Sequence, residues 1–103
     1  MKFFLYRLLP PRPSFPSDIT PAEAQLMRQH AQYWHQQLER GSVIVFGPVA
    51  DPKGSYGIAV LQLASDDDAQ VLASGDPVIK AGVGFTFELH LMPQCVTKSH
   101  ETI

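Results

Sequence analysis

The pattern of hydrophobic positions is clearest between residues 20 and 41, where apolar side chains recur with the period of an α-helix. At about 100° per residue these side chains form one stripe, which is predicted to be buried. The stripe consists of Met27, Ala31, Trp34 and Leu38. Thr20 and Glu23 have the spacing of a capping box, and Gly41 is a typical helix stop. The segment is therefore predicted to be one helix, with His30 at the border of its buried stripe.

Four segments are predicted to be β-strands. Lys2–Leu9 is almost continuously apolar, as expected for a strand that is covered on both faces. Val83–Met92 alternates apolar and polar residues with the period of two that marks a half-buried strand. Ser42–Pro48 and Gly57–Ala64 are separated by a turn with Asp-Pro and Lys-Gly pairs, so we expect an antiparallel hairpin.

The segment between the first strand and the first helix, Pro10–Thr20, has four prolines in its first seven residues. Proline cannot donate a backbone hydrogen bond, so this segment is expected to be a long loop. Loops of this length often cover a binding site. Phe15 or Ile19 can close over such a site, and an ordinary surface loop with one packed aromatic side chain is an equally good interpretation.

A second helix is predicted to begin at Ser65, whose side chain can cap it, and to end at Gly75. Three aspartates follow Ser65 and favour the positive N-terminus of a helix. A metal site is the alternative, but consecutive carboxylates on a helix point in divergent directions. Val71 and Leu72 are the expected core anchors. The segment after this helix is expected to be a loop or short turn, and the tail 94–103 is expected to be frayed.

The resulting order is strand, helix, strand, strand, helix, strand, which predicts an α+β ferredoxin-like plait with an antiparallel sheet. Residues 1–93 form the expected domain. Both helices would cover one face of the sheet, and the chain has no element left to cover the other face. Only 17% of the residues are charged, below the roughly 25% of an average globular domain. We therefore expect a homodimer that pairs through the open face of the sheet.

Composition and charge exclude several classes of function. The net charge of −2, without a basic cluster, argues against binding to nucleic acids. No segment approaches the roughly 20 apolar residues that a transmembrane helix needs. The apolar start of the chain is short and interrupted by Arg7, which disfavours a signal peptide. Because a single cysteine, Cys95, cannot form an internal disulfide, a cytoplasmic location is expected.

Several short motifs resemble, in their order and spacing, those of the YCII-related (YciI-like) family. They are His30 followed by YW and by LxxG at Leu38–Gly41, then Gly47-Pro48 with Asp51 and Gly54, then Asp76-Pro77. The resemblance extends from about Lys2 to Pro93. It implies a dimeric α+β barrel and an active site built from a helix histidine and the aspartate of the Asp-Pro motif, which are His30 and Asp76 in this chain.

This pair suggests acid–base chemistry on a small anionic or phenolic molecule. A carboxylate bonded to one nitrogen of an imidazole fixes the tautomer and makes the other nitrogen a stronger base. The expected reaction is a cofactor-independent isomerisation or elimination. No metal is expected, because His30 and His35 lie about 140° apart on their helix. The further candidates for substrate binding are Arg7, Gly47, Pro48, Ser55 and Tyr56.

Structural interpretations of the same residues remain open. Arg7 can be an anion anchor at the mouth of a pocket, or an edge residue whose stem is packed and whose head is solvated. His30 can be a packed, hydrogen-bonded residue of the core, and Asp76 can simply open a turn. A dimeric module that binds a small molecule or another protein without catalysis is therefore the rival function.

Overall fold

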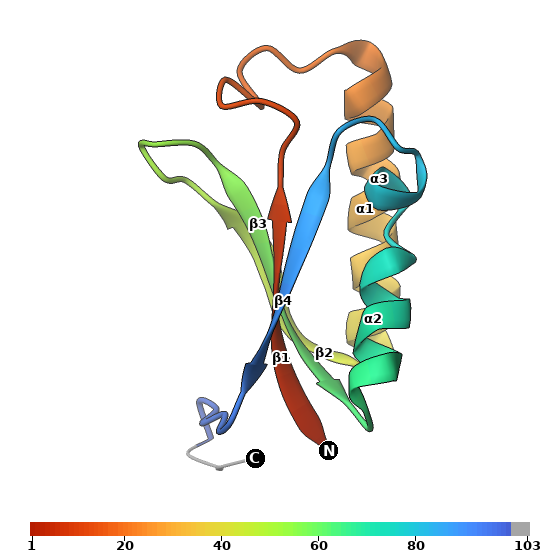
Figure 1. Ribbon diagram of the computed structural model, residues 1–103, viewed down its shortest axis with the longest axis vertical. Coiled ribbons are helices and arrows are strands. Elements are labelled where there is room, and N and C mark those ends of the chain that lie inside the picture. Colours follow the sequence, from red (N-terminus) through yellow and green to blue (C-terminus); the bar gives the residue numbers. More distant parts are fainter. Residues whose placement is uncertain (100–103) are drawn as a thin grey trace.

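The computed structural model describes residues 1–99 and contains one antiparallel sheet with helices on one of its faces (Figure 1). The expected α+β architecture is confirmed. In chain order the elements are β1 (Lys2–Leu9), α1 (Pro21–Glu39), β2 (Val43–Val49), β3 (Tyr56–Leu63), α2 (Asp66–Ser74), α3 (Pro77–Lys80) and β4 (Thr86–Met92). No helix among residues 1–99 is both long and apolar enough to cross a membrane.

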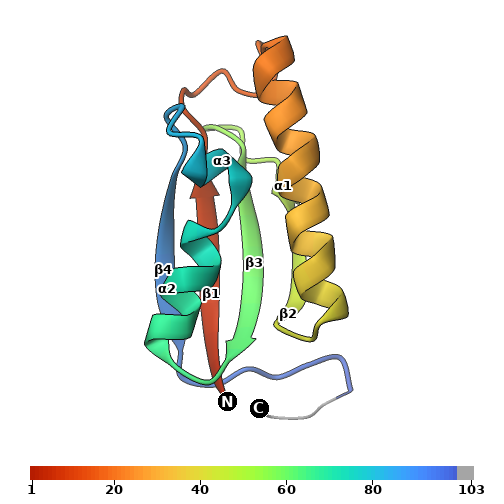
Figure 2. The same ribbon diagram turned by 90° about the vertical axis from the view of Figure 1, so that its right-hand side faces the viewer.

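The strand order is β2-β3-β1-β4, as in a ferredoxin-like plait, and every neighbouring pair is antiparallel. β1 lies at the centre, and Tyr6 pairs with Ala59 of β3 and Leu89 of β4. Because side chains alternate along a strand, Phe4, Tyr6 and Leu8 share the face that the helices cover, and all three are buried. In Figure 2 the helices stand in front of this face, with α2 over β1 and β4 and α1 towards β2.

The ends of α1 form as predicted, but its buried face is rotated. The capping box between Thr20 and Glu23 is present, and Gly41 has a left-handed φ of 82°. The buried residues of α1 are Glu23, Trp34 and Gln37. Leu38 was expected to be buried and is 39% exposed. The prediction was wrong because polar residues of α1 also point inward, which turns the face roughly 50° away from the centre of the apolar stripe.

The segment from α2 to α3 differs from the prediction in two ways. Val71 was expected to anchor α2, but it is 73% exposed, and the helix instead buries Ala69 and Ala73 completely. Small side chains allow this short helix to lie close against the sheet. The expected loop after α2 contains the short helix α3. Asp76 caps it by accepting a hydrogen bond from the backbone N–H of Val78 at 3.1 Å.

The C-terminal part of the chain is more ordered than expected. β4 begins at Thr86 instead of Val83, while Phe85, just before it, is 7% exposed. Leu91 follows the predicted alternation but is 57% exposed, since β4 is an edge strand. In the tail, Cys95 is buried and Val96 forms a β-bridge, so this part is packed and not frayed. The last four positions of the tail, 100–103, lie outside the described residues.

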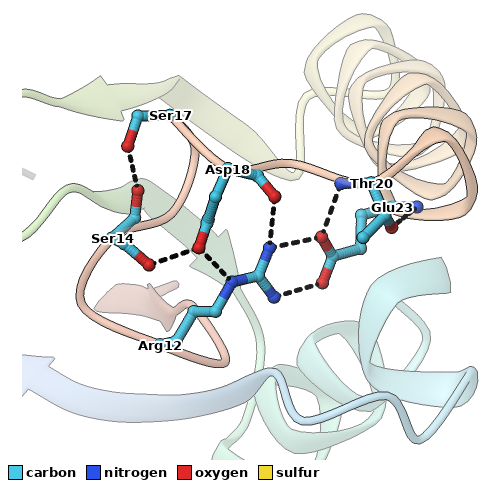
Figure 3. A network of polar contacts seen from close by, with 6 residues as sticks. All are labelled: Arg12, Ser14, Ser17, Asp18, Thr20 and Glu23. Carbon is cyan, nitrogen blue, oxygen red and sulfur yellow. Dashed lines mark hydrogen bonds and ion pairs between the residues drawn. The ribbon is translucent and has the colours of Figure 1, made fainter.

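The proline-rich loop between β1 and α1 is held by a set of ion pairs that we call the Arg12 clasp: Arg12, Asp18 and Glu23 (Figure 3). The Arg12 guanidinium donates to both carboxylate oxygens of Glu23 at 2.7 Å, and its Nε lies 2.9 Å from Asp18. These bonds, with a further bond from the Thr20 backbone N–H, lower the pKa of Glu23 from 4.5 to about 2. The pKa of Asp18 is also lowered, chiefly by its hydrogen bond from Arg12.

The clasp predicts a specific acid sensitivity. Because the pKa of Glu23 is lower in the folded state, its ionised form adds stability above pH 4.5, and this contribution disappears as the pH falls towards about 2. In Arg12→Gln the free energy of unfolding should therefore fall less steeply over this interval than in the wild type. Urea unfolding, followed by circular dichroism at several pH values in this interval, measures the free energy of unfolding of both proteins.

Arg28→Gln is the matched control, because Arg28 is exposed on α1 and forms no ion pair among the described residues. Parallel pH dependences for the wild type and Arg12→Gln would contradict this role of the clasp.

Candidate functional site

Asp76 is the centre of the candidate site and is completely buried between α2 and α3. Its carboxylate accepts hydrogen bonds from Tyr6 Oη at 2.9 Å and from Trp34 Nε1 at 2.8 Å. His30 Nδ1 lies 2.8 Å from Oδ2 and 3.0 Å from Oδ1. Together with the backbone N–H of Val78, these donors satisfy a charge that would otherwise be very costly to bury.

The surroundings of Asp76 determine which nitrogen of His30 is free. An ionised carboxylate can only accept hydrogen bonds, so Nδ1 of the neutral ring must carry the proton. Burial raises the pKa of the Tyr6 hydroxyl above its ordinary value, and the charge of Asp76 raises it further. His30 Nε2 has no hydrogen-bond partner among residues 1–99. It is therefore the nitrogen that can exchange a proton with a bound molecule.

A close contact next to Asp76 positions α1 against the end of α2. Tyr33 Oη donates a 2.7 Å hydrogen bond to the backbone carbonyl of Leu72. The backbone of Gly75 lies directly beside this hydroxyl, and a Cβ atom at position 75 would come within 2.5 Å of Tyr33 Oη. Glycine is thus favoured here by space and not by backbone conformation, since its φ of −80° suits any residue. The contact fixes the helix that carries His30 relative to the residue before Asp76.

His30 lines a cavity of about 330 Å³ between α1 and the sheet. Four residues of the proline-rich loop, together with Phe85, close one side of it: Pro10, Phe15, Pro16 and Ile19. Phe15 and Phe85 pack edge to face with ring centroids 5.4 Å apart. Figure 2 shows how this loop runs from the end of β1 to the start of α1. The other lining residues come from β1, α1 and the β2–β3 hairpin.

The structure brings most of the predicted substrate-binding residues to this cavity. Gly47, Pro48, Ser55 and Tyr56 line it together with His30. Asp76 does not line it, because the carboxylate lies behind the imidazole ring.

Arg7 does not line this cavity, although it contacts Tyr56, which does. It lies on the face of the sheet that the helices leave open, where it forms a 2.9 Å ion pair with Glu88. Its guanidinium carbon lies 4.5 Å from the centroid of the Tyr56 ring. Arg7 is not among the residues that line the cavity of His30, so the structure does not place it as an anion anchor there.

Sequence analysis missed Tyr6 and Trp34 as partners of the carboxylate. Both occupy apolar positions in the hydrophobic pattern, which predicts burial but no polar partner. The available signal was chemical, because a buried tyrosine or tryptophan usually needs a hydrogen-bond partner. Residues 1–99 contain no cluster of three or more His, Cys, Asp or Glu side chains that could hold a metal ion.

Comparison with known proteins identifies the family. A family model described as the YCII-related domain matches residues 4–92. Similar solved structures include 5-chloro-2-hydroxyhydroquinone dehydrochlorinase (TftG) from Burkholderia phenoliruptrix AC1100, in complex with 2,5-dihydroxybenzoquinone. The two chains are 21% identical, the match covers 85% of this chain and 91% of that chain, and the TM-score is 0.56, which supports the fold. A comparison with curated proteins gave no match. By its sequence match over most of its length, the chain belongs to the YCII-related family.

Proposed function

We propose that this protein is a small-molecule enzyme in which His30 is the general acid and base and Asp76 orients it. The observation that supports the proposal is the 2.8 Å bond between His30 Nδ1 and the fully buried carboxylate of Asp76. The imidazole ring of His30 also lines a cavity. A fixed imidazole with one free nitrogen facing a cavity has the geometry that proton transfer requires.

The reaction proposed is an isomerisation or an elimination that begins at a carbon next to a carbonyl group, which a hydroxylated ring presents in its keto tautomer. His30 Nε2 takes the proton, and the electron pair of the broken C–H bond passes into the enolate. In an isomerisation the imidazolium returns the proton to another carbon. In an elimination the enolate expels a leaving group, which departs with its bonding electrons. Positioned proton transfer of this kind contributes about 10²–10⁴-fold.

The neighbouring structure supports the elimination branch of this proposal. That protein is a dehydrochlorinase, and a dehydrochlorination removes a proton and a chloride from one molecule. Such a reaction needs a base, for which His30 is our candidate in this chain, and no redox step. We therefore propose elimination as the first reaction to test in this chain, without a cofactor.

A non-catalytic binding module is the second candidate, and the environment of Asp76 favours it. The carboxylate holds Tyr6 and Trp34 in the core whether or not His30 ever exchanges a proton. Loss of activity in a variant of Asp76 would consequently not distinguish the two functions. His30 is the more informative position, because it lies at the edge of the cavity and its side chain is 16% exposed.

We also propose that two copies pair through the open face of the sheet, in the manner of a dimeric α+β barrel. Leu5, Ile58 and Val60 are half-buried on this face, and Val45 is 49% exposed beside them. A second copy would remove this apolar surface from water. We also propose a cytoplasmic location, because the single cysteine, Cys95, is a free thiol.

The catalytic role of His30 predicts a large loss of turnover in His30→Gln. Chloride release from 5-chloro-2-hydroxyhydroquinone is the first assay, and kcat should fall about 10²–10⁴-fold. His35→Gln, the same change at an exposed histidine of α1, should retain wild-type turnover. Equal activity of the wild type and His30→Gln would contradict the proposal.

The tautomer of His30 is a prediction that needs no substrate. In ¹⁵N NMR spectra recorded where the imidazole of His30 is neutral, its proton should reside on Nδ1, because the carboxylate of Asp76 can only accept a hydrogen bond. His35 serves as the internal control, since no carboxylate lies against its ring among the described residues. A dominant Nε2–H form of His30 would show that the free nitrogen is not a base.

The proposed dimer predicts that a charge on the open face will separate the subunits. Val45→Glu should reduce the mass in sedimentation equilibrium from that of a dimer to that of a monomer. Val71→Glu is the matched control, because Val71 is exposed on α2 at the other face. A wild-type protein that sediments as a monomer would contradict this part of the proposal.

A further inference from the structure

The cavity next to His30 is lined almost entirely by apolar and aromatic groups. Six of the lining residues are Phe, Tyr or Trp, namely Tyr6, Phe15, Trp34, Phe46, Tyr56 and Phe85. No Asp, Glu, Lys or Arg is among the lining residues in the part of the chain that the structure describes. Such a wall offers little to compensate the hydration that a charged ligand would lose on entry.

The charge behind the wall further disfavours an anion. Asp76 is negative and lies directly behind His30, so the pair is negative when the imidazole is neutral and uncharged when it is protonated. Two guanidinium groups lie against rings of the wall, Arg7 at Tyr56 and Arg12 at Phe15. Arg7 already pairs with Glu88, and Arg12 already pairs with Asp18 and Glu23. An anionic substrate would therefore enter an apolar cavity without a net positive charge to receive it.

The size and shape of the cavity fit a single ring. An apolar cavity of about 150 Å³ in another protein binds benzene, and this one has about 330 Å³, enough for a ring with several substituents. Aromatic rings prefer edge-to-face or offset contacts with one another. Two pairs of rings in the wall are already arranged in this way. Phe15 and Phe85 pack edge to face, and Tyr6 and Trp34 pack tilted with centroids 4.8 Å apart.

We infer that this cavity takes an uncharged molecule built on one aromatic ring, with its reacting polar group turned towards His30 Nε2. Of the two classes that the sequence suggested, anionic and phenolic, the structure selects a phenol in its neutral form. The inference rests on the proposed function for the role of His30, but the binding of the ring depends on the apolar walls alone.

The test is a binding experiment on the full chain with labelled methionine methyl groups. The chain has three methionines, and Met27 lines the cavity, whereas Met1 is exposed and Met92 is on the open face of the sheet. A ring bound in the cavity shifts the Met27 methyl signal through its ring current. Met1 and Met92 are internal controls, and their signals should not move.

Two pairs of probes separate charge from shape. Methyl benzoate and benzoate differ chiefly in charge, and the uncharged ester should bind at least about tenfold more tightly. Phenol and cyclohexanol have similar size and polarity, and phenol should bind about threefold or more tightly. Benzoate binding as tightly as its ester, cyclohexanol binding as tightly as phenol, or probes that leave Met27 unmoved would overturn the inference.

Two variants complete the experiment. Ala31→Leu should weaken phenol binding by filling the cavity, and Ala22→Leu, the same change at an exposed position of α1, should not. His30→Gln should keep the affinity for methyl benzoate within about threefold. Ring binding that survives in His30→Gln supports the inference even if the catalytic proposal fails. Conversely, turnover without the predicted ring preference would overturn the inference and leave the acid–base pair intact.

Discussion

One buried negative charge connects the helical layer to the sheet. Asp76 is fully buried and accepts hydrogen bonds from β1 through Tyr6, from α1 through Trp34 and His30, and from α3 through the backbone of Val78. Because an unpaired carboxylate in this place would be strongly unfavourable, each donor must be in position when the protein is folded. The geometry of the candidate site is thus a consequence of how the two layers meet.

Much of this arrangement could be predicted from local signals. Thr20, Glu23 and Gly41 bound the first helix because capping depends on a few neighbouring residues, and alternation marked the strands. The meeting of His30 with Asp76, 46 positions later, was implied by the family resemblance together with the expected topology. No pattern of spacing along the chain alone would have paired them.

The remaining features depend on contacts that local patterns do not encode. The buried face of α1 includes Glu23 and Gln37. Arg12 from the preceding loop pairs with Glu23, which a hydrophobic stripe cannot show. The exposure of Val71 depends on how closely α2 approaches the sheet. Arg7 was ambiguous because alternation could place it on either face until the register of β1 was known.

The contact between Gly75 and Tyr33 limits how this architecture can diversify. A side chain at position 75 would meet the hydroxyl of Tyr33, so the tyrosine would have to shift and its hydrogen bond to Leu72 would be disturbed. Positions 33 and 75 are therefore coupled in redesign. The cavity can be reshaped at its loop and hairpin, while the contact between α1 and the end of α2 makes exchanges at positions 33 and 75 depend on each other.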